Sequence, residues 1–395
     1  MTPVRKEKVG LNIFYITALG ASARSFLIPH FLALRKEGHK LSLLCSDDQE
    51  AQDVITTTNI GFYPIPLSSS ISPLNDIFSV LRLCQYFRTY QPDVMHAHMS
   101  KAGFVSLIAG YICRVRVRIY HNHGMACFSS TGVRKIVLSM IERINCTLAT
   151  EVLFCSNSTK EEAIRRGLCN AKKVLVLGKG TISGVAVEEF SPANAAFQSH
   201  KIFQEFSHLS LHRKYVSFVG RVVPHKGVDT LLSAWANLSN EIKETHSLII
   251  AGDNDGDALY ERLMSTIERD DTVLYLGRID NILGLYGLTE VLVLPSLHEG
   301  FPYSVLEAQS CGVPALVTNV TGNSDAIVAN ESGVLVKVND TLDLIEKLEK
   351  LLDNKSRQEE MGIAARKTVL NNFSQNVVIG NLVNYYKKYC VVSNI

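Results

Sequence analysis

The sequence predicts an α/β protein with two doubly wound, Rossmann-like domains that face each other across a cleft. Patterns typical of buried strands alternate with patterns typical of helices along nearly the whole chain. The alternation runs twice, in two stretches that meet near Ser191-Pro192. Units of strand, helix and strand form parallel sheets, and such sheets bind ligands beyond the carboxyl ends of their strands.

The composition is that of an ordinary globular protein. Of 395 residues, 46% are hydrophobic and 20% are charged, which excludes a wholly disordered chain. No apolar run approaches the about 20 residues that a membrane-spanning helix needs, and the first residues lack the pattern of a secretory signal. The nine cysteines form no Cys-x-x-Cys pair, which argues against a disulfide framework or a zinc knuckle. We therefore expect a cytoplasmic protein with reduced thiols.

The two halves of the chain differ in charge. Residues 1–192 contain 22 Lys and Arg against 14 Asp and Glu, whereas residues 193–395 contain 18 against 24. A basic half indicates an anionic partner, either a phospholipid surface or a phosphorylated substrate, unless the unevenness is due to chance. Nothing in this pattern suggests a nucleic acid.

The first half is expected to form one doubly wound sheet. Residues 9–19 are typical of a buried parallel strand, Gly20, Ala21 and Ser22 follow as a turn, and a helix over 26–38 ends at Gly38. Further strands are expected over 41–46, 93–98, 116–123, 151–156 and 173–180, and further helices over 74–90, 101–112, 132–149 and 158–167.

The second half repeats the alternation after a polar stretch that runs to about Arg213. Strands are expected over 215–220, 247–252, 273–277, 291–296 and 314–318, and helices over 228–238, over 257–269 and from about Tyr303. We predict domain boundaries that give a first domain of 1–188, a second of 189–372, and a C-terminal helix within 373–395 that crosses back to the first domain.

The strongest chemical signal is the segment 291–314. A strand ends at Pro295-Ser296, the loop contains Glu299 and Gly300, and the next helix contains Glu307. Two carboxylates placed in this way can face one cleft, where they accept hydrogen bonds from sugar or ribose hydroxyls. Gly300 allows close approach to the backbone, and the free amides at the helix start favour a phosphate. On spacing alone, Glu307 can equally be a solvated helical residue.

The second signal follows the strand that ends at Gly220. Arg221 and Lys226 lie in the loop before a helix whose first turn contains Asp229. Two cations at the carboxyl end of a strand, beside a helix N-terminus, suit a diphosphate, although they can also be ordinary surface charges. The segment lacks the P-loop pattern.

With these two segments, the sequence closely resembles the retaining glycosyltransferases of family 4, which have the GT-B architecture of two facing Rossmann-like domains. The resemblance covers essentially the whole chain. It implies that Glu307 binds the donor ribose, that Glu299 holds hydroxyls of the transferred sugar, and that Arg221 and Lys226 neutralise the diphosphate. Further donor contacts that it implies come from backbone or packing positions, namely Gly220, Gly277, Ile279, Gly300 and Phe301.

The first half matches the family less sharply. Gly20 and Ala21 lie where family members often have two glycines whose amides face a phosphate. His123, followed by Gly124, matches the family histidine that contacts the donor sugar near the reaction centre. His96, His98 and His121 are interpreted as packing or loop residues. The spacing of these histidines also suggests zinc, but two His-x-His pairs without cysteine or carboxylate partners fit the cleft of the family better.

No cofactor and no metal are expected. The acidic run 253–257 resembles a divalent-metal motif, but the family has a turn there, and the run lacks the spacing of a calcium-binding EF-hand loop. The resemblance implies that sugar is transferred with retention of configuration by a front-face route, in which the leaving phosphate takes the proton of the acceptor.

The branch of the family that the chain most resembles assembles O-antigen, capsule or glycoprotein glycans in bacteria. The donor expected is therefore a UDP-linked hexose or N-acetylhexosamine, and the acceptor a polyprenyl-diphosphate-linked glycan. We expect the basic half to dock this acceptor at the inner face of the cell membrane, as a peripheral contact with its anionic surface. Its candidate contacts are cations that the sequence places on one strand face and one helix, namely Arg114, Arg116, Arg118, Arg134 and Lys135.

Other classes share the two-domain build. A sugar-nucleotide epimerase or a pyridoxal-dependent phosphorylase explains the Glu299 and Glu307 segment less well. An NAD dehydrogenase needs G-x-G-x-x-G after the first strand, which is absent. A non-catalytic sugar-nucleotide-binding protein has no need of both Arg221 and Lys226 beside two carboxylates.

Overall fold

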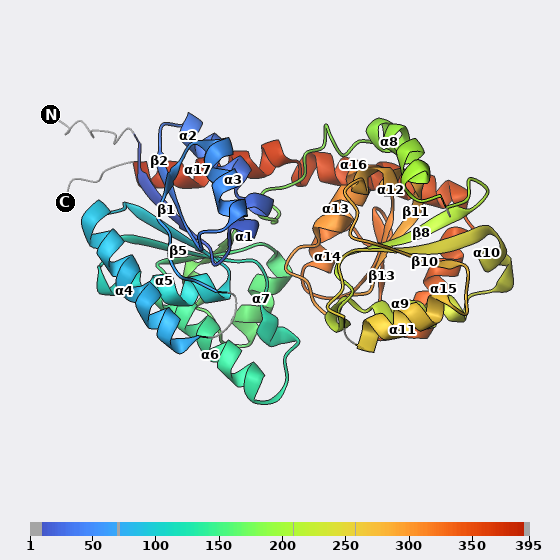
Figure 1. Cartoon of the computed structure of the whole chain (residues 1–395), viewed down its shortest axis with the longest axis horizontal. Helices are drawn as coiled ribbons and strands as arrows, with labels where there is room; N and C mark the ends of the chain where they lie inside the picture. The colour runs from blue at the N-terminus through green and yellow to red at the C-terminus, as the bar shows by residue number, and fades with distance from the viewer. Residues whose placement is uncertain (1–9, 69–71, 208, 257, 391–395) are drawn as a thin grey trace. The chain divides into compact units, whose positions relative to one another are not determined.

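The computed structural model describes residues 10–68, 72–207, 209–256 and 258–390. The chain divides into one unit of residues 1–184 with 375–395 and a second unit of residues 185–374 (Figure 1). Residues 185–188, which the sequence placed in the first domain, belong to the second unit. The reason is local, since the amide of Val185 donates a hydrogen bond to the carbonyl of Phe373 at 2.9 Å.

The first unit is built on a parallel sheet of seven strands in the order β3-β2-β1-β4-β5-β6-β7. Its strands are β1 Asn12–Ile16, β2 Lys40–Leu44, β3 Gly61–Phe62, β4 Val94–His98, β5 Val117–Asn122, β6 Glu151–Phe154 and β7 Val174–Val176. The order reverses between β1 and β4, so ligand-binding loops are expected where these strands end.

Helices cover both faces of this sheet (Figure 1). They are α1 Gly20–Phe26, α2 Ile28–Lys36, α3 Gln49–Thr58, α4 Pro73–Tyr90, α5 Ser100–Ile112, α6 Gly132–Leu148, α7 Asn157–Arg165 and α17 Gln375–Cys390, with short 3₁₀ turns at Ala126–Phe128 and Ala171–Lys173. Helix α17 packs against α2 although it comes from the end of the chain. Its Tyr386 is fully buried and hydrogen-bonded to Tyr15 of β1 at 3.2 Å.

The turn expected at Gly20 to Ser22 is instead the first turn of helix α1. The carboxylate of Asp48 accepts a hydrogen bond from the amide of Gly20 at 3.0 Å, so the helix start is satisfied from the loop after β2. The helix expected over 26–38 corresponds to α2, whereas Phe26 is the last residue of α1, and Leu27 separates the two helices.

The second unit contains a parallel sheet of six strands in the order β10-β9-β8-β11-β12-β13. These strands are β8 Lys214–Val219, β9 His246–Ala251, β10 Val273–Gly277, β11 Thr289–Leu294, β12 Ala315–Thr318 and β13 Gly333–Val336. The order reverses between β8 and β11, which are the strands that the Arg221 and Glu299 segments follow.

The helices of the second unit pack on both faces of its sheet (Figure 1). They are α8 Pro192–Glu205, α9 Val228–Ala236, α10 Asn240–Thr245, α11 Ala258–Ile267, α12 Ile282–Leu288, α13 Tyr303–Ser310, α14 Asn323–Ala326, α15 Thr341–Leu352 and α16 Lys355–Asn372, with a 3₁₀ turn at Pro224–Lys226. The stretch before Arg213, which the sequence described only as polar, contains helix α8. The Ser191 side chain caps this helix by accepting a hydrogen bond from the amide of Asn194, and the helix packs against α12.

Both units have apolar interiors made mainly by the strands and the inner faces of the helices. Among the described residues, no helix combines the length and the apolar composition that crossing a membrane requires.

Candidate active site

Lys226 and Glu299 meet at the carboxyl ends of two neighbouring parallel strands. Lys226 ends the 3₁₀ turn after β8, and Glu299 lies in the loop after β11. The Lys226 Nζ lies 2.6 Å from Glu299 Oε1, and both side chains are largely buried. The two sequence segments, 73 positions apart, therefore form a single site.

Further contacts fix the loop that contains Glu299. The Ser296 hydroxyl donates to Glu299 Oε1 at 2.7 Å, so both polar partners of the carboxylate use the same oxygen. The Glu299 amide donates to the carbonyl of Thr321 at 3.2 Å, which ties this loop to the one after β12. Next to Thr321, Gly322 has φ +82, and an added Cβ would lie 2.6 Å from the Gly300 carbonyl oxygen. Only glycine allows these two loops to approach so closely.

The positive charges at this site act on one another. Burial lowers the pKa of His225 to about 4, and the charges of His298, Lys226 and Arg221 contribute to the same shift. The rings of His225 and His298 lie 5.1 Å apart. Arg221 is thus electrostatically coupled to the group that contains Lys226 and Glu299, and its side chain is exposed to solvent. The cations of this group are therefore Arg221 and Lys226, and Arg221 is exposed where an anionic ligand can reach it.

Gly227 connects Lys226 to helix α9. It has φ +74, and an added Cβ would lie 2.0 Å from the carbonyl oxygen of Pro295, in the segment that leads to Glu299. The glycine therefore allows the loops after β8 and β11 to touch. The Leu297 amide reinforces the contact by donating to the His225 carbonyl at 2.8 Å.

The other positions that the sequence led us to expect at the donor lie along the ends of β8 and β10, next to the end of β9. The Gly220 amide donates to the Ala251 carbonyl at 2.9 Å, and the Gly252 amide donates to the Gly277 carbonyl at 2.7 Å. Gly277 has open space around its α-carbon, whereas Ile279 packs against the apolar cluster around Tyr215. These three strand ends therefore form a continuous backbone surface.

The acidic run after β9 forms a turn. The Asn254 Oδ1 accepts from the Gly256 amide at 3.0 Å, and Asp253 lies 3.8 Å from Arg278 across exposed surface. Asp257 lies outside the described residues.

Glu307 has a different environment from Glu299. It lies in α13, which begins at Tyr303 as expected, and its Oε2 accepts a hydrogen bond from the Tyr286 hydroxyl at 2.9 Å. Burial raises the pKa of Glu307 to about 7, although the bond from Tyr286 opposes the shift. Glu307 is therefore not the solvated surface residue that its spacing alone allowed.

Two backbone amides just before α13 are not needed for the hydrogen bonding of the fold. Within the described part of the chain, the amides of Gly300 and Phe301 donate no hydrogen bond. The Phe301 ring is buried and lies 5.2 Å from Phe373, so the backbone here is held in place. Free amides at a helix start attract anionic groups.

In the first unit, His123 and Gly20 both have hydrogen-bond partners inside the protein. The His123 Nε2 lies 2.9 Å from His98 Nδ1, and burial lowers the pKa of His123 to about 3. His123 is therefore neutral and held by a second histidine. The Gly20 amide is occupied by Asp48, whereas Ala21 is exposed in the first turn of α1.

The sequence suggested that Arg114, Arg116 and Arg118 alternate along one strand. The structure shows that they do not. Strand β5 begins only at Val117, and Arg114 lies in a turn with φ +54. The Arg118 guanidinium donates to the carbonyls of Leu148 and Val115, so it is partly used by the fold. The three line one hollow at the amino end of the sheet, the end opposite to His123. Arg134 and Lys135 are exposed in the first turns of α6.

Several residues that shape the site were not found from the sequence. Gly322 had a signal, because a Gly-containing segment directly follows a buried strand. Tyr286 had none, since a tyrosine inside an apolar helix is indistinguishable from a core residue. His98 was interpreted as packing, yet it holds His123.

Comparison with known families matches both halves of the chain to glycosyltransferases. Residues 201–368 match the family described as "Glycosyl transferases group 1", and residues 31–180 match the one described as "Glycosyl transferase 4-like domain".

Curated relatives extend over nearly the full chain. The capsular polysaccharide biosynthesis glycosyltransferase CapM of Staphylococcus aureus is 28% identical over 90% of this chain and 92% of its own. An Escherichia coli protein named UDP-Gal:alpha-D-GlcNAc-diphosphoundecaprenol alpha-1,3-galactosyltransferase is 29% identical over 93% and 94%.

Solved structures confirm the fold. A glycosyltransferase from Rickettsia africae superposes with a TM-score of 0.80 at 19% identity, covering 97% of this chain and 100% of that one. Anabaena HepE in complex with UDP superposes with a TM-score of 0.78 at 18% identity, covering 96% and 100%.

The pKa of Glu307 leads to a prediction about stability. The unfolded carboxyl has a pKa near 4.5 and the folded one a pKa of about 7, so the folded state binds more protons between these values. The stability that the protonated Glu307 carboxyl contributes is therefore lost as the pH rises from 4.5 through 7. Glutamine cannot ionise and can still accept the Tyr286 hydrogen bond. We expect Glu307→Gln to raise the thermal midpoint at pH 8 by about 2–4 °C more than at pH 5.

The matched control for this measurement is Glu299→Gln, which removes the partner of Lys226 and should lower the midpoint at pH 8. An identical change for Glu307→Gln at both pH values would show that its carboxyl does not titrate in this range.

Proposed function

Because this chain belongs to glycosyltransferase family 4 and has the GT-B fold, we propose that it transfers a hexose or an N-acetylhexosamine from a UDP-sugar to a polyprenyl-diphosphate-linked glycan. The transfer would serve bacterial capsule or O-antigen synthesis. The names of the S. aureus and E. coli relatives support the pathway and the lipid-linked acceptor. The UDP in the HepE complex supports the nucleotide. The observation that carries the proposal is the cationic group around the Lys226–Glu299 ion pair.

Lys226 and Arg221 would stabilise the departing diphosphate. Negative charge builds on this group as the bond to the sugar breaks, and fixed cations stabilise it without reorganising. Lys226 is held in place by Glu299, and an ammonium has three donors, so it can keep this bond while it binds a phosphate oxygen. The free amides of Gly300 and Phe301 would add further donors. We propose that no catalytic metal takes part.

The two glutamates would grip different parts of the donor. Glu299 uses Oε1 for Lys226 and Ser296, so its Oε2 is the oxygen that would receive sugar hydroxyls. Glu307 would accept the ribose hydroxyls, assisted by Tyr286. Neither carboxylate is then needed as a nucleophile. We propose transfer with retention, in which the leaving phosphate takes the proton of the acceptor hydroxyl while the new glycosidic bond forms.

A panel of donors tests this proposal. UDP-glucose, UDP-galactose, UDP-N-acetylglucosamine and UDP-N-acetylgalactosamine are incubated with polyprenyl-diphosphate-linked GlcNAc in the presence of EDTA. We expect one donor to give an α-linked product, identified by NMR of the released glycan. Epimerised UDP-sugar without transfer would support the epimerase alternative, and transfer that EDTA abolishes and added Mg²⁺ or Mn²⁺ restores would contradict the metal-free mechanism.

Lys226 provides a sharper test of the site. We expect Lys226→Ala to lower turnover by about 100-fold or more, because the leaving group loses a cation held by the protein. The matched control is Lys243→Ala, which removes a similarly exposed lysine that is paired with Asp270 at 3.1 Å in the same unit. Near-normal turnover of Lys226→Ala, or an equal loss in the control, would remove Lys226 from this role.

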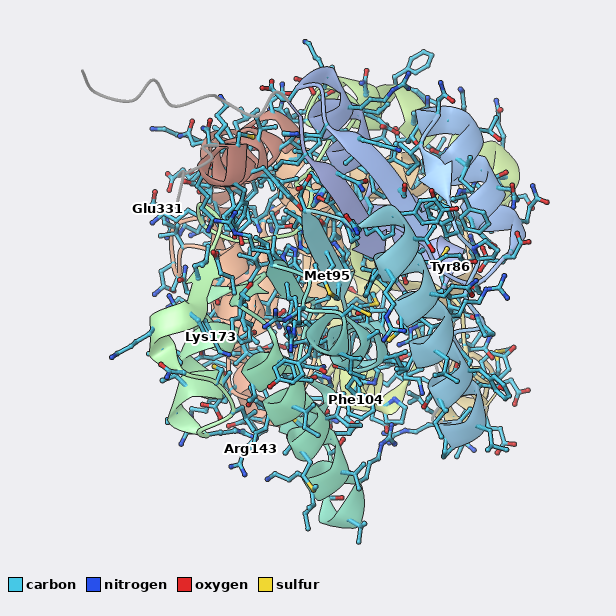
Figure 2. The ribbon with its side chains drawn as sticks, turned by 90° about the vertical axis from the view of Figure 1, so that its left-hand side faces the viewer. Tyr86, Met95, Phe104, Arg143, Lys173 and Glu331 are labelled. Atoms are coloured by element: carbon cyan, nitrogen blue, oxygen red, sulfur yellow. The ribbon has the colours of Figure 1, made fainter. Side chains whose placement is uncertain are left out.

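A second surface supports a membrane-bound acceptor. Helices α4 and α6 present apolar side chains to solvent on either side of α5, which provides Phe104 at the floor between them (Figure 2). The hollow has a volume of about 600 Å³. The exposed apolar side chains of these two helices, some of which line the hollow, are Leu74, Ile77, Phe78 and Leu81 of α4, and Val133, Ile136, Val137, Met140 and Ile144 of α6; we call this set the α4–α6 apolar face.

Cations border the α4–α6 apolar face. Arg134, Lys135 and Arg143 are exposed on α6 (Figure 2 shows Arg143). An amphipathic helical surface with a basic edge is typical of proteins that bind the interface of an anionic bilayer. We propose that this face, rather than the hollow lined by Arg114, Arg116 and Arg118, rests on the inner face of the cell membrane. The basic edge matches the anionic headgroups, and the apolar centre matches the acyl boundary.

Flotation with anionic liposomes checks this surface. We expect Ile77→Glu combined with Met140→Glu to reduce the bound fraction by about tenfold, because two charges would have to enter the acyl boundary. The control, Phe197→Glu, changes an exposed phenylalanine of the second unit and should bind like the unaltered protein. Equal binding of all three proteins would show that the α4–α6 apolar face does not contact the lipid.

A further inference from the structure

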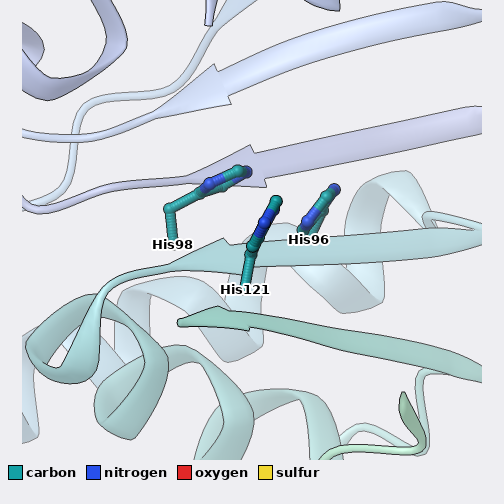
Figure 3. Close-up of side chains that lie close together, drawn as sticks. All are labelled: His96, His98 and His121. Atoms are coloured by element: carbon teal, nitrogen blue, oxygen red, sulfur yellow. The ribbon is translucent and has the colours of Figure 1, made fainter. Parts of the chain in front are cut away.

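Three buried histidines converge on one face of the first sheet. His96 and His98 are two residues apart on β4, and His121 lies opposite His98 on β5. Because side chains alternate between the faces of a sheet, all three point to the same side, as Figure 3 shows. His96 and His98 are 0% exposed and His121 is 2% exposed.

Each of these rings offers a nitrogen to a common point. One nitrogen from each residue lies within 4.8 Å of those of the other two. The nitrogens that have no hydrogen-bond partner in the described structure are His96 Nε2, His98 Nε2 and His121 Nδ1. A buried polar atom without a partner destabilises the fold. Three converging rings that each have such an atom therefore indicate a ligand.

In two of these rings, the second nitrogen already has a hydrogen-bond partner. The Nδ1 of His96 is hydrogen-bonded to the Tyr386 hydroxyl at 2.7 Å, and the Nδ1 of His98 to His123 at 2.9 Å. Histidines that ligate metals show this division, with one nitrogen on the ion and the other fixed by an outer partner.

We propose that His96, His98 and His121 bind one divalent transition-metal ion, with Zn²⁺ as the best match to three imidazoles. The fourth position of a tetrahedral ion would go to water. Zn–N bonds of about 2.0–2.1 Å bring tetrahedral ligand atoms to about 3.4 Å from one another. Binding therefore requires the rings to turn, since those of His96 and His121 are nearly parallel at 10°. Rotation about the bond to an imidazole ring is soft, which makes this adjustment inexpensive.

None of the proposed steps of sugar transfer takes place at this ion. It would fix His96, which contacts Tyr386 of α17, and His98, which holds His123. One ion would thus join the C-terminal helix, strands β4 and β5, and the loop after β5. The proposal does not depend on the proposed function, because the ion is detected on the protein alone.

Metal binding to the chelator-treated, full-length protein tests the proposal. Zn²⁺ is titrated in competition with a fluorescent chelator, and Co²⁺ is followed by the visible absorption of its tetrahedral complexes. We expect one ion per chain and a rise in the thermal midpoint with Zn²⁺. The variant His121→Asn should weaken Zn²⁺ binding by about tenfold or more and should abolish the Co²⁺ spectrum. His121 is the ligand to change, because its imidazole ring makes no hydrogen bond with another described residue.

His212→Asn is the matched control, since His212 is exposed in the second unit. It should bind Zn²⁺ like the unaltered protein. Less than one ion per chain, or equal binding by His121→Asn and the unaltered protein, would overturn the proposal and leave ordered water as the partner of these nitrogens. Circular dichroism shows whether His121→Asn is folded. If it is not, His96→Gln is titrated in its place.

Discussion

The ion pair between Lys226 and Glu299 depends on the neighbouring positions of β8 and β11. These strands are separated by 69 residues of chain between Val219 and Thr289, yet they lie side by side because the strand order reverses between them. Parallel strands end at the same edge of the sheet, so the loops that follow them must meet there. Gly227 and Gly322 remove the side chains that would keep the loops apart. The cation and the carboxylate are thereby positioned by the fold before any ligand arrives.

The two glutamates of this site show how environment differentiates identical residues. Glu299 lies beside an ammonium and a hydroxyl, so its charge is compensated. Glu307 has a tyrosine hydroxyl as its partner and lies in a place where burial raises its pKa to about 7. A carboxyl of this kind is poised between its two protonation states near neutral pH. Glu299 is held by its two partners, whereas the charge of Glu307 depends on its surroundings.

The sequence predicted the features that depend on local pattern. Alternating strands and helices indicated two parallel sheets, and loops at strand ends identified Lys226 and Glu299. Features that depend on distant contacts were not predictable. Gly20 begins a helix because Asp48, 28 residues later, binds its amide. Tyr286 of α12 meets Glu307 of α13 although the two lie 21 positions apart in the sequence. The prediction that the three arginines share one strand face was wrong because Arg114 lies in a left-handed turn before β5. Nothing in the local sequence favours that conformation.

The first unit is completed only by the end of the chain. Tyr386 of α17 is the hydrogen-bond partner of both His96 and Tyr15, and Tyr385 and Tyr389 bond to Glu151 of β6 at 2.9 and 2.6 Å. Residues 1–184 alone would therefore leave a buried imidazole and a carboxylate without their partners, which is costly in an apolar interior. Since α17 follows the whole second unit in sequence, the first sheet cannot acquire its final polar contacts until residues up to about 390 are present. The histidine face of β4 and β5 thus depends on the last helix for its order, although its own residues all lie within the first third of the chain.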